Sequence, residues 1–329
     1  MENGSNDVQL SRVPGMVPRG REPHVPSGAL WILIGCITST FLPFLGVAVI
    51  AYGAREMWEA KGMRGFFLAC GVGLAVCAAA SLADFASGVA LVSGLICALG
   101  IVWCMRDNHA TVLSVSVVIM GVVSLSIGIE AAIAVANGSS ITEVVEEVLS
   151  IIVAGTKQTA GVGIEADMLV QQMLPLFRAI WPFVYVAAAA MDALAASVGS
   201  YLMRVRTHGA VRFPAIASFD LPLWAVGVLA ASIIGLGVAS SGIPGADAIL
   251  TVSATALMSV RFIFAIQGFG VATAMANRFR FGCLGRFLLI FLSVQLETMF
   301  FALSIVGLID VWANFRKLPR GGSDAKANT

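Results

Sequence analysis

The sequence predicts an all-α protein, a polytopic transmembrane helical bundle with about eight apolar segments. Residues of the types AVILMFWYC make up 58% of the chain and DEKR only 12%, and the mean hydropathy is +0.91. A soluble domain carries about 25% charged residues. The apolar runs reach the length of about 20 residues that a membrane-spanning helix needs. Most tryptophans fall at the ends of these runs, as in the aromatic belts of membrane proteins.

The apolar segments follow one another with short connections. The first contains Pro43 and Gly46 at its middle, which predicts either a kinked helix or a broken, re-entrant pair. The second and third meet so closely at Asp84 that we expect a helical hairpin. The eight predicted segments are Ala29–Tyr52, Phe66–Ala83, Phe85–Met105, Thr111–Val135, Ile180–Leu202, Leu221–Ser240, Ala246–Ala276 and Leu284–Leu308.

Residues 29–317 therefore form the predicted transmembrane domain. The flanking tails, residues 1–28 and 318–329, are polar, and we expect both to be disordered. Residues 136–175 interrupt the domain as an amphipathic helical insertion, which begins with a capping box of Ser140 and Glu143. The acidic insertion is expected to be a solvated cap on the helix ends; the alternative is a lid over a mouth of the protein.

The distribution of basic residues bears on the orientation in the membrane. Counted with Arg286 at the start of the eighth segment, the first, third, fifth and seventh loops hold ten Lys and Arg residues, whereas the second, fourth and sixth hold two. The positive-inside rule places the ten-charge side in the cytoplasm. If all eight segments span the membrane, however, both basic tails lie on the opposite side and the bias disappears. The side on which the termini lie therefore stays open at this stage.

Several classes of function are disfavoured by the same sequence. The net charge of +1 gives no basic footprint for nucleic acid. The six cysteines lie in or beside apolar segments, without CxxC spacing, and the three histidines are far apart, so we expect neither a metal site nor a cofactor. No Ser/His/Asp set, HExxH or Walker sequence is present, so we expect no enzyme.

Five polar residues inside the apolar segments are the candidate binding residues for a substrate or ion. A charged side chain at the centre of a spanning helix costs about 2.5–3.5 kcal/mol, which argues for partners. Two of the five lie in the seventh segment and two in the eighth, at similar depths on either side of the connector. The fifth lies among alanines, which allow close helix approach. The set is Asp192, Arg261, Gln267, Gln295 and Glu297.

Two interpretations of this polar set compete. In one, its members satisfy one another and lock the bundle, with Arg261 and one carboxylate as a structural ion pair. In the other, which we favour, they line a site for a small polar solute or cation. The first function hypothesis is accordingly a small-solute transport or binding component embedded in the lipid bilayer. The alternative is a non-catalytic membrane scaffold that recruits protein partners through its basic loops and C-terminal tail.

Three short motifs carry a family resemblance. FDLPLW (Phe219–Trp224), IQGFG (Ile266–Gly270) and VGLIDVWANFRK (Val306–Lys317) resemble the YybS-like family of predicted bacterial membrane proteins. The resemblance covers about Ala29 to Lys317 and implies a multi-pass protein of the bacterial inner membrane. The family has no established function, but it is distantly similar to the substrate-binding components of energy-coupling-factor transporters. In the third motif, Asp310 and Arg316 predict either a local cap or a docking motif.

Overall fold

The computed structural model describes residues 22–106, 111–160, 164–208, 219–279 and 282–318. All elements in these ranges are α-helices, which confirms the all-α prediction. Five helices are long and apolar enough to cross a membrane, or up to six if one bent pair counts as a single span. The prediction of about eight spans is therefore wrong, because the first and last segments are each broken into shorter helices and the sixth is short.

The first predicted segment is a helical hairpin. Helix α1 (Val25–Ser39) begins within the tail that was expected to be disordered, and α2 starts at Pro43 and extends to Lys61 (Pro43–Lys61). Proline suits the first position of a helix because it lacks an N–H that would stay unpaired there. The two helices pack so closely that a Cβ added to Gly28 would lie 2.7 Å from the carbonyl oxygen of Gly53. Of the two alternatives, the broken pair is confirmed.

A second hairpin, predicted from the sequence, follows the first. Helices α3 (Met63–Ala83) and α4 (Phe85–Cys104) turn at Asp84, whose carboxylate caps α4 by accepting from the Ser87 N–H at 3.0 Å. The two hairpins are built alike. In each, a serine near the end of the first helix lies against a glycine of the second, less than 3.0 Å from a Cβ added there: Ser39 against Gly46, and Ser81 against Gly88.

The middle of the chain holds three helices. Helix α5 (Val112–Ala136) is followed by α6 (Ile141–Ala160), whose predicted capping box is confirmed by Ser140 N–H donating to Glu143 at 2.9 Å and Glu143 N–H to Ser140 at 3.3 Å. Helix α7 (Ile164–His208) is a single helix of 45 residues. The second half of the predicted insertion and the predicted fifth segment are therefore one continuous helix. Pro175 and Pro182 lie inside this helix and do not end it.

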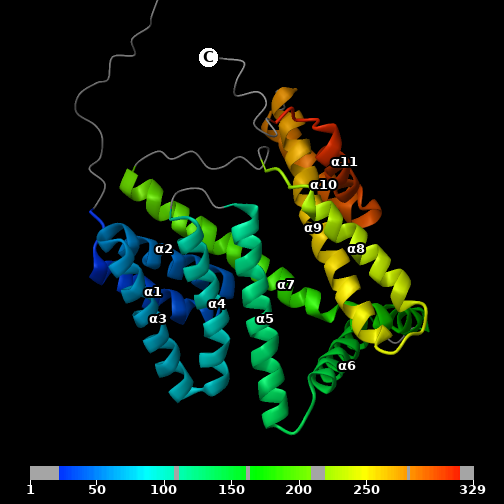
Figure 1. Cartoon of the computed structure of the whole chain (residues 1–329), viewed down its shortest axis with the longest axis horizontal. Coiled ribbons are helices and arrows are strands. Elements are labelled where there is room, and N and C mark those ends of the chain that lie inside the picture. The colour runs from blue at the N-terminus through cyan, green and yellow to red at the C-terminus, as the bar shows by residue number, and fades with distance from the viewer. Residues whose placement is uncertain (1–21, 107–110, 161–163, 209–218, 280–281, 319–329) are drawn as a thin grey trace, which may run out of the picture.

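Helix α7 connects two groups of helices. It packs against α2, α4 and α5 of the N-terminal group and against α9 of the C-terminal group. Figure 1 shows α7 running diagonally across the N-terminal group and towards the lower ends of α8 and α9. Gly199 permits its approach to α2, since a Cβ there would lie less than 3.0 Å from the backbone of Ala48.

The C-terminal group consists of α8 (Trp224–Ala239), α9 (Ala246–Arg278), α10 (Cys283–Phe300) and α11 (Ala302–Ala313). The last two are bent by 94° relative to each other. The continuous eighth segment was therefore a wrong prediction. The break needs neither proline nor glycine, because Phe301 takes the left-handed conformation with φ of 56°. Helix α11 then packs on α9.

Candidate functional site: polar networks of the C-terminal helices

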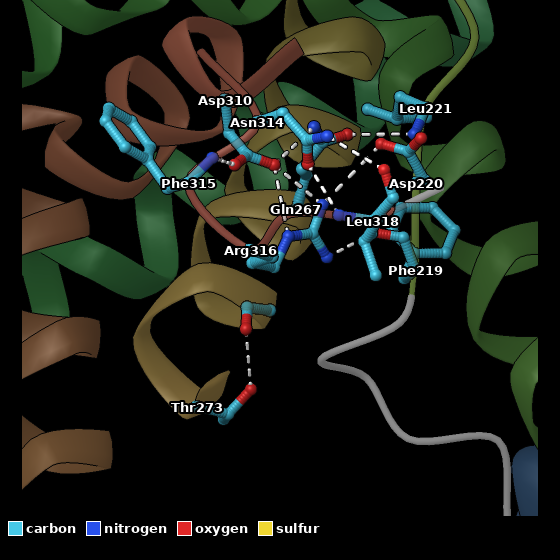
Figure 2. A network of polar contacts seen from close by, with 11 residues as sticks. Phe219, Asp220, Leu221, Gln267, Thr273, Asp310, Asn314, Phe315, Arg316 and Leu318 are labelled. Carbon is cyan, nitrogen blue, oxygen red and sulfur yellow. Dashed lines mark hydrogen bonds and ion pairs between the residues drawn. The ribbon is translucent and has the colours of Figure 1, made fainter. Parts of the chain in front are cut away.

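A fully buried polar network joins α9 to the end of α11. The Gln267 side chain donates from Nε2 to Asp310 Oδ2 at 3.1 Å. Arg316 donates to the same oxygen from Nη2 at 2.7 Å and from Nε at 3.1 Å. Gln267 and Asp310 are 0% exposed, and the Arg316 side chain is 2% exposed. Figure 2 shows these groups converging. The network holds a charged pair, with its hydrogen bonds, away from solvent.

The same network fixes the segment that leads into α8. Arg316 Nη1 donates to the Phe219 carbonyl, and Nη2 lies 3.7 Å from Asp220 Oδ1. The Leu221 N–H donates to Gln267 Oε1 at 3.0 Å. The three motifs singled out in the sequence thus meet at one place, each supplying at least one hydrogen-bonding group.

Local backbone geometry returns the chain to this network after α11. Asn314, at the C-cap, has φ of 43°, a left-handed conformation that asparagine tolerates better than most residues. Its side chain exchanges two hydrogen bonds of 2.8 Å with the backbone of Leu318. The Phe315 N–H donates to Asp310 Oδ1 at 2.9 Å. The turn therefore directs Arg316 back towards Asp310, so that the predicted local Asp–Arg cap is confirmed and extended by Gln267.

A second network occupies the α10–α11 break. Arg261 Nη2 lies 3.5 Å from Glu297 Oε1, so Arg261 pairs with one carboxylate, as in the structural interpretation of the polar set. Glu297 Oε2 accepts from the Ser304 N–H at 3.0 Å, in the first turn of α11. A carboxylate is favourable there because the N-terminus of a helix carries partial positive charge. The Arg261 guanidinium also stacks on Phe301, 3.6 Å from the ring centroid.

The other two predicted site residues lie elsewhere. The Gln295 side chain is exposed, and the Gln295 backbone carbonyl accepts a hydrogen bond from the Thr298 hydroxyl. Asp192 is half-buried on α7. The adjacent Ala193 packs into the core of the N-terminal helices, and Asp192 lies near enough to Cys97 of α4 to interact with it electrostatically. The five residues therefore do not form one centre: Arg261 and Glu297 meet, Gln267 turns to Asp310, and Asp192 and Gln295 join neither pair.

Alanine substitutions test whether Glu297 is paired and Gln295 is not part of the second network. Glu297→Ala removes the partner of Arg261 and the cap of α11, and we expect it to lower the free energy of unfolding by about 1–3 kcal/mol. Gln295→Ala, two residues away on the exposed face, is expected to change it by less than about 0.5 kcal/mol. Thermal unfolding of both variants in detergent checks this. Equal losses would contradict the assignment.

A third polar cluster, near the end of α2, was missed by sequence reasoning. Arg55 Nε lies 3.1 Å from Glu59 Oε1, and Arg55 Nη1 donates to the Met105 carbonyl at 2.9 Å. Glu59 also accepts from the Thr207 hydroxyl of α7 at 2.7 Å. Arg55 and Glu59 fall in the predicted first loop, between Tyr52 and Phe66. The spacing of Arg55 and Glu59, typical of an ion pair on one helix face, was the available signal.

An open cleft of about 380 Å³ lies beside the first network, between the start of α5 and the segment before α8. Asp220 and Thr111 contribute polar groups to its lining, and Trp224 contributes an aromatic ring. Within the part of the chain that the structure describes, no group of three or more His, Cys, Asp or Glu side chains can hold a metal ion.

Comparison with known proteins yields no relative: no family model, no curated protein and no solved structure matches this chain.

Proposed function

We propose that this chain is a non-catalytic, multi-pass membrane scaffold of the bacterial inner membrane. The observation that carries the proposal is the pairing of its interior charges. In the C-terminal helices, Asp310 pairs with Arg316 and Glu297 with Arg261. Charges that bind each other stabilise one arrangement of helices rather than a solute. Of the two interpretations of the polar residues, the structural one therefore has the stronger support here.

The networks hold the ends of two basic segments in place. The first network joins Phe219, directly after the connector of residues 209–218, to Arg316, directly before the C-terminal residues. By sequence, the connector contains Arg212 and the C-terminal residues contain Arg320 and Lys326. A fixed base for two basic segments suits the recruitment of an acidic protein partner, because complementary charge increases the rate of encounter.

Cross-linking in native membranes tests this proposal. We expect partners captured by the full chain to be lost when Arg212, Arg320 and Lys326 are changed together to glutamine. The matched control is Arg178→Gln, which removes an exposed arginine paired with Glu146 of α6. Capture that survives the triple substitution, or that is lost equally in the control, would contradict recruitment through these segments.

A second candidate function, small-solute or cation binding, is favoured by Asp192. No hydrogen bond or ion pair reaches its carboxylate from the residues that the structure describes, although it is half-buried on α7. A carboxylate at membrane depth is costly unless it is protonated or meets a cation. Of the five candidate binding residues, Asp192 is therefore the one that still supports a solute site.

Ligand-induced stabilisation tests the solute hypothesis. A solute that binds at Asp192 stabilises the folded state, by about 2.7 kcal/mol at a hundredfold excess over the dissociation constant. We expect small cations and cationic solutes, screened by thermal unfolding, to raise the Tm of the wild type but not that of Asp192→Asn. An equal rise in both proteins, or none with any solute, would rule out this site.

A further inference from the structure

We infer that the α1–α2 hairpin and the bent α10–α11 pair are re-entrant, with tips that contact lipid acyl chains, and that both termini share the cytoplasmic face with the basic helix ends. This inference concerns the lipid-facing surface and does not depend on the proposed function. It rests on helix length, the chemistry of the turns, the direction of the helices and the distribution of charge.

Helix length sets α1 and α11 apart from α3 and α4. At 1.5 Å per residue, α1 with 15 residues is about 22 Å long and α11 with 12 residues about 18 Å, short of a hydrocarbon core about 30 Å thick. Helices α3 and α4 have 21 and 20 residues, which is enough to cross. A hairpin with a short arm can enter the core and return.

The turns within the α1–α2 pair and the α10–α11 pair are apolar and exposed. Phe41, at the α1–α2 tip, is 81% exposed, and the neighbouring Leu42 is also exposed. Met299 and Phe300, at the α10–α11 tip, are 70% and 69% exposed. Lipid accommodates such a surface, whereas water disfavours it.

Three other turns contain polar residues. Residues 240–245, between α8 and α9, read SSGIPG, and residues 137–140, between α5 and α6, read NGSS. The α3–α4 turn places the exposed Asp84 between the exposed Leu82 and Phe85. Polar residues of this kind are expected in turns that meet water. The turns without them, at Phe41 and Phe301, are therefore assigned to the membrane interior, and the polar turns to its surface.

Contacts place the start of α1 beside the end of α2, and the end of α11 beside the end of α9. The N–H of His24, before α1, approaches Glu56 near the end of α2 at 3.5 Å, so α1 starts where α2 finishes. In the C-terminal group, residue numbers increase in the same direction along α9 and α11: Arg261 contacts Ser304, and six residues later Gln267 contacts Asp310. The two helices therefore run in the same direction, and α11 ends on the side where α9 ends.

The ends of α2, α4 and α7 and the starts of α5 and α8 lie on the same side of the molecule. Arg55 of α2 contacts Met105 after α4, and Thr207 of α7 contacts Glu59. The start of α5 and the segment before α8 line one cleft. All these ends form one face of the molecule, which we call the basic face.

The charge on this face gives its side of the membrane. The re-entrant geometry removes the conflict in the sequence count, because both basic tails now join the loops that hold ten basic residues. Positive residues concentrate on the cytoplasmic side. In the described part of the chain, the basic face carries Arg55, Lys61, Arg64, Arg106, Arg204, Arg206, Arg278, Arg316 and Lys317.

Reporter fusions to the full chain test the inference. Green fluorescent protein, which fluoresces only in the cytoplasm, is fused to either terminus or inserted in residues 209–218; alkaline phosphatase, active only outside, is placed at the same sites. Insertions at 241–242 give the opposite reference. We expect fluorescence at the termini and at 209–218, and phosphatase activity at 241–242. A terminus on the side opposite to residues 209–218 would overturn the re-entrant geometry.

The tip itself is tested by a matched pair of substitutions. Phe41→Asp places a charge at the proposed lipid-buried tip, whereas Ile243→Asp places one in the polar α8–α9 turn. We expect the yield of monodisperse, folded protein to fall several-fold for Phe41→Asp and to stay unchanged for Ile243→Asp. Equal yields of the two variants would overturn the lipid contact of the α1–α2 tip.

Discussion

Replacing Asp310 by alanine is expected to lower the free energy of unfolding by about 3–5 kcal/mol, the cost of leaving a buried charge without its partner. Asp310 is fully buried and accepts from Gln267, Phe315 and Arg316. Its loss leaves the buried Arg316 guanidinium with only the more distant Asp220 carboxylate, 3.7 Å away, as a compensating charge. The variant should unfold at a markedly lower temperature in detergent and yield less folded protein.

The control for this prediction is Glu147→Ala, which removes an exposed carboxylate from α6. Its expected effect is within about 0.5 kcal/mol, as for most surface substitutions. If Asp310→Ala were no more harmful than this control, the first network would contribute little to stability, and its residues would be available for another role.

Gly307→Leu is expected to separate α11 from α9. A Cβ at position 307 already lies less than 3.0 Å from the carbonyl oxygen of Phe264 and from the backbone nitrogen of Gly268, so a side chain forces the helices apart. Overpacking of this kind costs about 1–3 kcal/mol and occasionally more. Because α11 carries Asp310 and Ser304, we expect both polar networks to be disturbed, with a fall in Tm greater than that of Glu297→Ala.

Gly227→Leu on α8 is the matched substitution, since nothing lies within 4 Å of a Cβ at that position. Replacing an interior helical glycine with leucine favours the helix by up to about 1 kcal/mol. We therefore expect Gly227→Leu to be neutral or stabilising. Similar losses for the two variants would show that leucine itself, and not close helix packing, causes the effect.

The sequence predicted those features that depend on composition and local pattern. Apolar length and polar turns gave the helical class, the α3–α4 hairpin and the capping box at Ser140. Depth along antiparallel helices placed Arg261 within reach of the polar residues of the next helix, because this argument needs only the rise per residue. The partner in the structure is Glu297, which lies before the bend.

The sequence could not predict the features that depend on three-dimensional contacts. The break at Phe301 contains no proline or glycine, so a continuous helix was expected and Asp310 was placed at its far end, away from Gln267. The bend and the turn at Asn314 bring Asp310 and Arg316 back to α9. Asp192 was assigned to the same centre from its depth and its alanine neighbours, but neither says which neighbouring helix a helix face meets.

A double-mutant cycle on Asp310 and Arg316 tests most directly whether the interior charges serve one another. The single variants Asp310→Leu and Arg316→Met and the double variant are compared by their free energies of unfolding. We predict a coupling energy near the upper end of the range for residues in contact, about 3 kcal/mol, with the double variant more stable than either single one. Additive losses, with a coupling near zero, would contradict the account.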